Sequence, residues 1–193
     1  MQTLVLLVAL LRRNGDFRRL FLASVVSQIG DWFAFVAVSG FVAERTGKPG
    51  LAAVVYAASV LPILFLSPLA GVFADRWDRK RLMVGADLVR VVPALAILLA
   101  LHVGSPILAL AGVITLSAVS AFFEPAAAAA APNLVDAEDL PVAQAGMGSL
   151  WGTMLFVGAA VGGLVTAAIG RKASIAIDAG SFRTLTGGRA VAA

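Results

Sequence analysis

The sequence predicts an all-α integral membrane protein, and three observations lead to this fold class. Of its 193 residues, 60% are hydrophobic and 13% are charged, whereas soluble domains average about 45–50% and about 25%. The mean hydropathy is +0.95. The apolar residues form long runs separated by short polar turns, and a spanning helix needs about 20 such residues. The length therefore allows five or six spans and leaves no room for a separate catalytic domain.

Five apolar runs are expected to cross the bilayer. They are residues 20–43, 51–74, 82–101, 107–131 and 146–169. The stretch 173–193 has the length of a sixth span but contains Asp178, Arg183 and Arg189, and each charge at a helix centre costs about 2.5–3.5 kcal/mol on insertion scales. We therefore divide the chain into an N-terminal cytoplasmic segment, a five-span bundle, and an incomplete sixth span with a divergent tail. The boundaries are 1–19, 20–172 and 173–193.

The basic residues predict the orientation of these spans. If the N-terminus lies in the cytoplasm, cytoplasmic segments hold eight of them: Arg12, Arg13, Arg18, Arg19, Arg76, Arg79, Lys80 and Arg81. The outer loops then hold four: Arg45, Lys48, Arg171 and Lys172. Because Lys and Arg are retained on the cytoplasmic side, this bias favours a multi-pass protein with its N-terminus inside. The short apolar stretch 4–11 is expected to lie on the membrane surface.

The residue types exclude several classes of function. The chain has no Cys and only His102 as histidine, which excludes thiolate metal sites, a cysteine nucleophile and a histidine cluster. No loop holds a nucleophile and a base together. We therefore predict no enzymatic activity, no cofactor and no metal. The expected partners are the lipid bilayer and a small-molecule substrate if the protein is active; nucleic acid is not expected, since the basic residues lie at the ends of apolar runs.

Two acidic residues inside spans are the candidate proton or substrate sites. Asp31 lies roughly 18 Å from the cytoplasmic end of its span, near the midplane, and Glu124 lies roughly 11 Å deep. A carboxylate at such a depth needs a water-filled cavity or a partner, and it can bind a cation or carry a coupling proton. The alternative for Asp31 is a structural hydrogen bond to a neighbouring helix, with Gln28 nearby. For Glu124, beside Pro125, the alternative is a contact with the local backbone or with a basic group on another span.

Two other patterns are interpreted as structural. Asp87 and Arg90 lie three residues apart on one face of a helix, where they can neutralise each other. In the fifth span, Gly158 and Gly162 recur at four-residue spacing, which favours close approach of another helix.

The most specific motif lies between the second and third spans. Asp75 ends a helix, where the dipole disfavours an acid, so we expect it to be stabilised from outside its own helix. Asp78 can cap the next span. The segment reads Gly71-Val72-Phe73-Ala74-Asp75-Arg76-Trp77-Asp78-Arg79-Lys80-Arg81. It resembles the signature loop of the major facilitator superfamily, Gly-x-x-x-Asp-Arg-x-Gly-Arg-Lys/Arg, except that Asp78 replaces a Gly. The resemblance implies a gating loop made of Gly71, Asp75, Arg76, Arg79 and Lys80.

Further segments are similar to one branch of that superfamily, which contains macrolide efflux and enterobactin export proteins. They are Phe17-Arg18-Arg19-Leu20, Ser27-Gln28-Ile29-Gly30-Asp31-Trp32, Phe123-Glu124-Pro125-Ala126 and Pro132-Asn133-Leu134-Val135. The fifth span carries Gly158-Ala159-Ala160-Val161-Gly162-Gly163, which resembles the antiporter motif Gly-Pro-x-x-Gly-Gly with Ala159 in place of the proline. The similarity extends from about residue 11 to residue 182.

The resemblance implies the N-terminal half of a transporter built from two six-helix bundles, with substrate bound between them. The implied activity is secondary active transport: proton-coupled efflux of a drug-like or siderophore-like molecule across the bacterial inner membrane. In the family, the acid at the position of Asp75 engages the second half, which this chain lacks. A frameshift or early stop is the simplest expectation, and a separately encoded C-terminal half could still complete the transporter. The rival hypothesis is an inactive truncated remnant, or a small membrane-embedded interaction protein.

Overall fold

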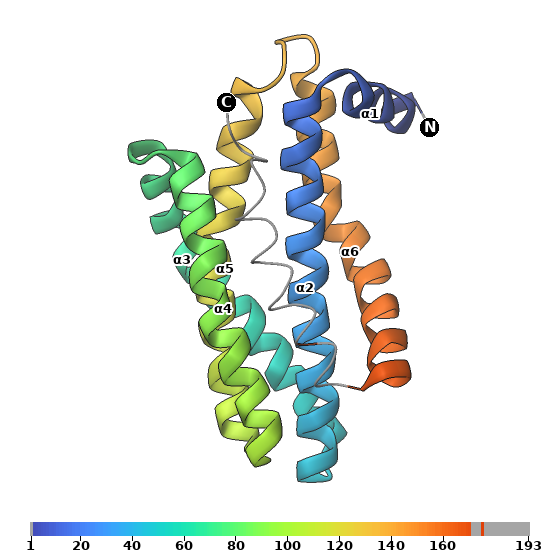
Figure 1. Ribbon diagram of the computed structural model, residues 1–193, viewed down its shortest axis with the longest axis vertical. Helices are drawn as coiled ribbons and strands as arrows, with labels where there is room; N and C mark the ends of the chain where they lie inside the picture. The colour runs from blue at the N-terminus through green and yellow to red at the C-terminus, as the bar shows by residue number, and fades with distance from the viewer. Residues whose placement is uncertain (1, 171–174, 176–193) are drawn as a thin grey trace.

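A computed structural model describes residues 2–170 and residue 175 of the chain, and this part is helical without strands. The helices are α1 (Gln2–Arg13), α2 (Gly15–Thr46), α3 (Ala52–Arg76), α4 (Arg79–Val103), α5 (Pro106–Ala130) and α6 (Leu140–Ile169), with short 3-10 turns at Pro49–Leu51 and Ala131–Asn133. Figure 1 shows α2 to α6 running along the length of the bundle, while α1 lies across one end. The predicted all-α membrane fold is therefore confirmed.

The helices agree closely with the predicted spans. Among the described residues, four segments are long and apolar enough to cross a bilayer: Gly15–Thr46, Pro49–Arg76, Arg79–Val103 and Pro106–Asn133. They contain the first four predicted spans, and the fifth falls within α6, a helix of 30 residues. The expected sixth span and tail, 173–193, lie outside the described residues apart from residue 175.

Capping side chains determine where the helices begin. The Asn14 side-chain oxygen accepts hydrogen bonds from the backbone N–H groups of Asp16 and Phe17, at 3.1 and 2.9 Å, so α2 starts before the apolar run that predicted it. Asp78 caps α4 as predicted, accepting from the Arg81 N–H at 2.7 Å. At the other end of α4, Gly104 adopts a φ of 75°, a left-handed conformation that glycine adopts without strain.

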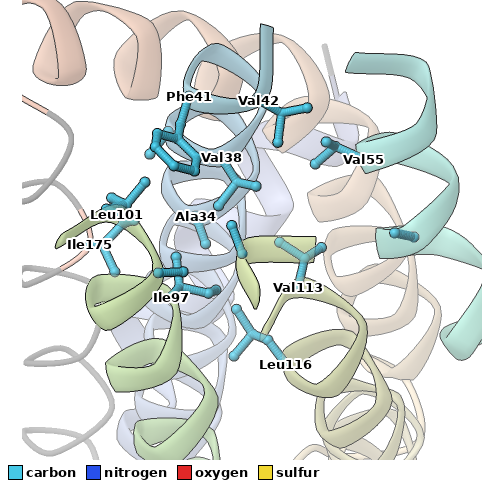
Figure 2. Close-up of a cluster of buried hydrophobic side chains, with 14 residues drawn as sticks. Ala34, Val38, Phe41, Val42, Val55, Ile97, Leu101, Val113, Leu116 and Ile175 are labelled. Carbon is cyan, nitrogen blue, oxygen red and sulfur yellow. The ribbon is translucent and has the colours of Figure 1, made fainter. Parts of the chain in front are cut away.

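Two apolar cores hold the bundle together, one toward each end. Figure 2 shows the core distant from α1, in which Ala34, Val38 and Phe41 of α2 meet side chains from α3, α4 and α5. The second core lies near α1 and includes Phe17, Leu20, Met83, Phe123 and Ala127. Small residues let the helices approach closely: a methyl group on Gly112 of α5 would lie 2.5 Å from Cγ1 of Ile97 on α4. Large apolar side chains also cover the outside, including Leu61, Leu64 and Phe65 of α3, as expected of a surface that faces lipid.

We expect Gly112→Ala to destabilise the bundle, because the added methyl group overlaps the buried Ile97 side chain and overpacking costs about 1–3 kcal/mol. The matched control is Gly85→Ala on α4, where no atom of the described residues lies within 4 Å of an added Cβ. The control should leave stability unchanged or raise it, since Ala favours a helix over Gly by up to about 1 kcal/mol. The melting temperatures of both variants in detergent test this expectation. Equal effects would contradict a close α4–α5 contact at Gly112.

The bundle also makes the orientation of the chain testable. Helix α1, the α3–α4 turn and the α5–α6 connection lie toward one end, and the α2–α3 and α4–α5 connections lie toward the other (Figure 1). Because the chain has no Cys, single cysteines can report the side on which each end lies. If the N-terminus is cytoplasmic, a membrane-impermeant thiol reagent should label Lys48→Cys in intact spheroplasts and Glu138→Cys only after permeabilisation. The opposite pattern would reverse the predicted topology.

Candidate functional site

A layer of buried and half-buried polar side chains separates the two apolar cores. Its members are Ser24, Ser27, Gln28 and Asp31 on α2, Asp87 and Arg90 on α4, and Ser117, Ser120 and Glu124 on α5. Within each helix these residues recur at spacings of three or four, which places them on one face. Among residues 2–170 and 175, no group of three or more His, Cys, Asp or Glu is arranged to hold a metal ion. The layer is therefore a hydrogen-bonded and charged network.

Arg90 lies at the centre of this layer, with its side chain only 1% exposed. Its guanidinium donates hydrogen bonds to Oγ of Ser27 and, at 3.3 Å, to Oδ1 of Asp87. Its Nη2 lies 3.9 Å from Oδ2 of Asp31, and its Cζ lies 4.9 Å from the centroid of the Phe123 ring, within the range of a cation–π interaction. The predicted Asp87–Arg90 pair is confirmed. Arg90 additionally connects α4 to α2 and α5, and spacing within one helix does not predict these contacts.

The two candidate carboxylates each have a hydrogen-bond partner on a neighbouring helix. Ser120 on α5 donates to Oδ1 of Asp31 at 3.4 Å, and Gln28 on α2 donates to Oε1 of Glu124 at 3.1 Å. These two bonds cross between α2 and α5 in opposite directions. Asp31 thus has the structural hydrogen bond to a neighbouring helix that is the alternative to a functional role. The Asp31 side chain nevertheless remains 33% exposed, so it is also accessible to a ligand.

Both carboxylates line a pocket of about 100 Å³ between α2, α3 and α5. The same pocket is lined by three aromatic side chains, Trp32, Phe35 and Tyr56. Their rings pack edge to face, with centroids 5.5 Å apart for Trp32–Phe35 and 5.8 Å apart for Phe35–Tyr56. The pocket therefore combines acidic oxygens with aromatic faces, and among the described residues no Lys or Arg is part of its lining.

The charges around the pocket are unbalanced. Asp31 and Asp87 both approach Arg90, and Glu124 lies within electrostatic reach of Arg90 and Asp31. When all of these groups are ionised, three carboxylates share one guanidinium. Buried charges require compensation, so this layer can take up a further positive charge, either a proton or a cation.

The gating loop implied by the sequence lies on the surface of the bundle. Asp75, Arg76 and Lys80 are exposed, and Gly71 and Arg79 are half-buried. Within the part of the chain that the structure describes, the Asp75 side chain has neither a hydrogen bond nor an ion pair, and a methyl group on Gly71 would meet no atom within 4 Å. The contact expected for Asp75 from outside its own helix therefore remains a prediction.

The glycine positions of the antiporter-like motif lie in α6. Gly158, Gly162 and Gly163 lie in the C-terminal half of this helix. Gly163 is half-buried, and no atom of the described residues lies within 4 Å of a Cβ placed there. Its role in helix packing also stays a prediction.

Arg90→Met should destabilise the bundle by about 3–5 kcal/mol, because it leaves the Asp87 carboxylate buried without its partner. Adding Asp87→Asn to that variant should recover part of the loss, since the uncompensated charge is removed. The control is Arg19→Met, whose partner Asp16 lies 3.0 Å away with both side chains about half exposed; it should change stability by about 1 kcal/mol or less. Thermal unfolding in detergent measures these three variants and the single variant Asp87→Asn, which completes the comparison. Additive losses from Arg90→Met and Asp87→Asn would contradict a coupled pair.

Comparisons with known proteins agree with this architecture. The profile of the family described as transmembrane secretion effector matches residues 8–188. Among curated relatives, the uncharacterized MFS-type transporter YkuC of Bacillus subtilis is 28% identical over 171 residues, which cover 88% of this chain and 40% of the relative. The multidrug efflux pump Tap of Mycobacterium tuberculosis is 29% identical over 182 residues, which cover 88% of this chain and 42% of Tap.

Macrolide efflux protein A of Streptococcus pyogenes is similar to the same extent, at 29% identity over 164 residues, covering 84% of this chain and 40% of that protein. The chain thus spans about two-fifths of the length of these three relatives. No solved structure matches it at a significant level. The family consists of transporters and not of enzymes, as the sequence predicted. On the evidence of the family match and the helical membrane fold, the chain belongs to the transmembrane secretion effector family of major facilitator transporters.

Proposed function

We propose that this chain forms the N-terminal half of a proton-coupled exporter of the bacterial inner membrane, with its N-terminus in the cytoplasm. The observation that carries the proposal is the pocket in which Asp31 and Glu124 face three aromatic side chains. Relatives of this chain include a multidrug efflux pump and a macrolide efflux protein, which supports export as the direction of transport.

Competition between a proton and a cationic substrate would provide the coupling. Asp31 is 33% exposed to the pocket and also lies 3.9 Å from Arg90. A bound cation compensates the excess negative charge, and so does a proton on Asp31 or Glu124. If the two cannot be present together, binding of one favours release of the other, as linkage requires. Proton entry would then drive the cation out.

The pocket chemistry favours an amphipathic drug-like cation over an anionic siderophore-like molecule. The faces of Trp32, Phe35 and Tyr56 can bind an organic cation through cation–π interactions, and their apolar area suits a hydrophobic ligand. An anion would meet two carboxylates and, among the described lining residues, no basic side chain.

A complete exporter also requires a second bundle, and we propose a C-terminal half as the partner of this one. Asp75 is exposed, and no atom of the described residues lies within 4 Å of a Cβ placed on Gly71. The C-terminal end of α3 is therefore available for such a contact. Under the rival hypothesis, an inactive remnant or interaction protein, the pocket would bind no cation.

The test is binding of tetraphenylphosphonium, a hydrophobic cation, to the chain in lipid nanodiscs by isothermal titration calorimetry. Asp31→Asn should weaken binding about tenfold or more, since a charge-assisted contact contributes roughly 1.5–3 kcal/mol. Glu124→Gln should weaken it as well. Asp136→Asn is the control, because Asp136 is an exposed acid outside the pocket, and its loss should have no effect.

The pH dependence of binding tests the coupling. Protons neutralise the carboxylates, so affinity should fall as the pH is lowered, and cation binding should release protons into the buffer. Both effects should be reduced in Asp31→Asn. Binding that is independent of pH would rule out competition at these acids, and absence of binding would favour the rival hypothesis.

A further inference from the structure

We propose that α1 binds anionic phospholipid headgroups on the cytoplasmic leaflet and, through its contact with α6, ties the bundle to that lipid surface. The proposal concerns a surface outside the pocket and does not depend on transport. Helix α1 lies across the end of the bundle and not along it (Figure 1). In a bilayer spanned by α2 to α5, that end lies at the boundary between headgroups and acyl chains.

The free face of α1 is apolar. Leu4 and Val5 are each 67% exposed, Leu6 is 53% exposed and Val8 is 43% exposed. These side chains are outside the predicted spans, and leaving them in water would be unfavourable in proportion to their area. A helix with such a face lies stably in the interfacial plane of a membrane with its apolar side toward the acyl chains.

The opposite face of α1 fixes the helix to the start of α6. Leu7 and Leu10 are buried, and Leu7 occupies the space beside Gly146, where a methyl group would lie 2.6 Å from its Cδ1. Arg13 forms an ion pair with Asp139, in the turn before α6, and the Asn14 side-chain amide donates to the backbone carbonyl of Leu134. One side of α1 thus packs against the bundle, and the other side is exposed and can contact lipid.

Arg12 borders the free face of α1, and neither Arg12 nor Arg18, which follows at the start of α2, has an ion-pair partner among the described residues. Arg13 is paired with Asp139 and Arg19 with Asp16, whereas Arg12 and Arg18 are exposed and form no ion pair there. A shallow hollow on α1 is lined by Leu4, Val5, Val8 and Ala9 together with Arg12 and Arg13. This arrangement places a basic group at one end of an apolar surface, which matches the phosphate and acyl chain of an anionic phospholipid.

The absence of Cys makes the proposal directly testable. Val5→Cys, labelled with an environment-sensitive bimane, reports the surroundings of α1 in the detergent-solubilised full chain. Titration with dioleoylphosphatidylglycerol should shift the emission to the blue at lower lipid concentration than dioleoylphosphatidylcholine does. Arg12→Gln and Arg18→Gln should each raise the half-saturating concentration of the anionic lipid roughly fivefold. Lys48→Gln, at the other end of the bundle, should leave it unchanged.

The same titration can overturn the proposal. Equal responses to the two lipids, or an equal effect of Lys48→Gln and Arg12→Gln, would exclude a specific anionic-lipid site on α1. The link to α6 is tested by Gly146→Leu, whose side chain would take the place of Leu7. The anionic lipid should raise the melting temperature of the wild-type chain, and Gly146→Leu should remove this increase. If the anionic lipid still raises the melting temperature of that variant, the contact between α1 and α6 does not couple lipid binding to the stability of the bundle. Failure of cation binding in the pocket would leave all of these readouts unaffected.

Discussion

The buried guanidinium of Arg90 is the charge on which the arrangement of the bundle depends. A cation in an apolar interior is stable only with good partners, and these come from three different helices: Ser27 and Asp31 on α2, Asp87 on its own helix α4, and the ring of Phe123 on α5. The apolar cores on either side contain Ala together with Val, Leu, Ile and Phe, and apolar attraction is not directional. The polar layer, in contrast, fixes the register of α2, α4 and α5, because a shift of one residue would separate Arg90 from its partners.

The groups that fix the register also hold the carboxylates at the pocket. Asp31 contacts Arg90 through one oxygen and Ser120 through the other, and a proton or a cation in the pocket would compete with both contacts. A change of charge at this site would therefore act on the packing of the helices. This dual role gives a physical reason why a binding event in the pocket could change the conformation of the bundle.

Local features of the sequence predicted more of this structure than long-range ones could. The apolar runs predict the spans, and Asp78 is recognisable as a helix cap. The spacing of three residues predicts the pair formed by Asp87 and Arg90, because both lie on one face of the same helix. Helix α2 begins before the predicted span, since hydropathy predicts the part of a helix that lies in the bilayer, whereas the helix itself extends through Asp16, Arg18 and Arg19 from the cap at Asn14. The Arg90–Asp31, Ser120–Asp31 and Gln28–Glu124 contacts join residues that are 59, 89 and 96 positions apart in the sequence. Such contacts depend on the register between helices, which no single-helix pattern encodes; the signal available was the rarity of charges in apolar spans.

The two carboxylates at the pocket, Asp31 and Glu124, lie on helices that pack against different neighbours. Helix α2, which carries Asp31, packs mainly against α6, and α5, which carries Glu124, packs against α3 and α4. The lipid contact proposed for α1 acts on α6, whereas the second bundle proposed as a partner would act at Asp75 on α3. Lipid binding at α1 would therefore act on Asp31 through α6 and α2. Binding of the second bundle would act on Glu124 through α3 and α5. The two effects meet where Ser120 bonds to Asp31 and Gln28 bonds to Glu124, because these hydrogen bonds join α2 to α5, and at Arg90, which contacts both α2 and α5. Relative movement of α2 and α5 must break or exchange these hydrogen bonds, and it would do so beside the pocket proposed to bind the substrate.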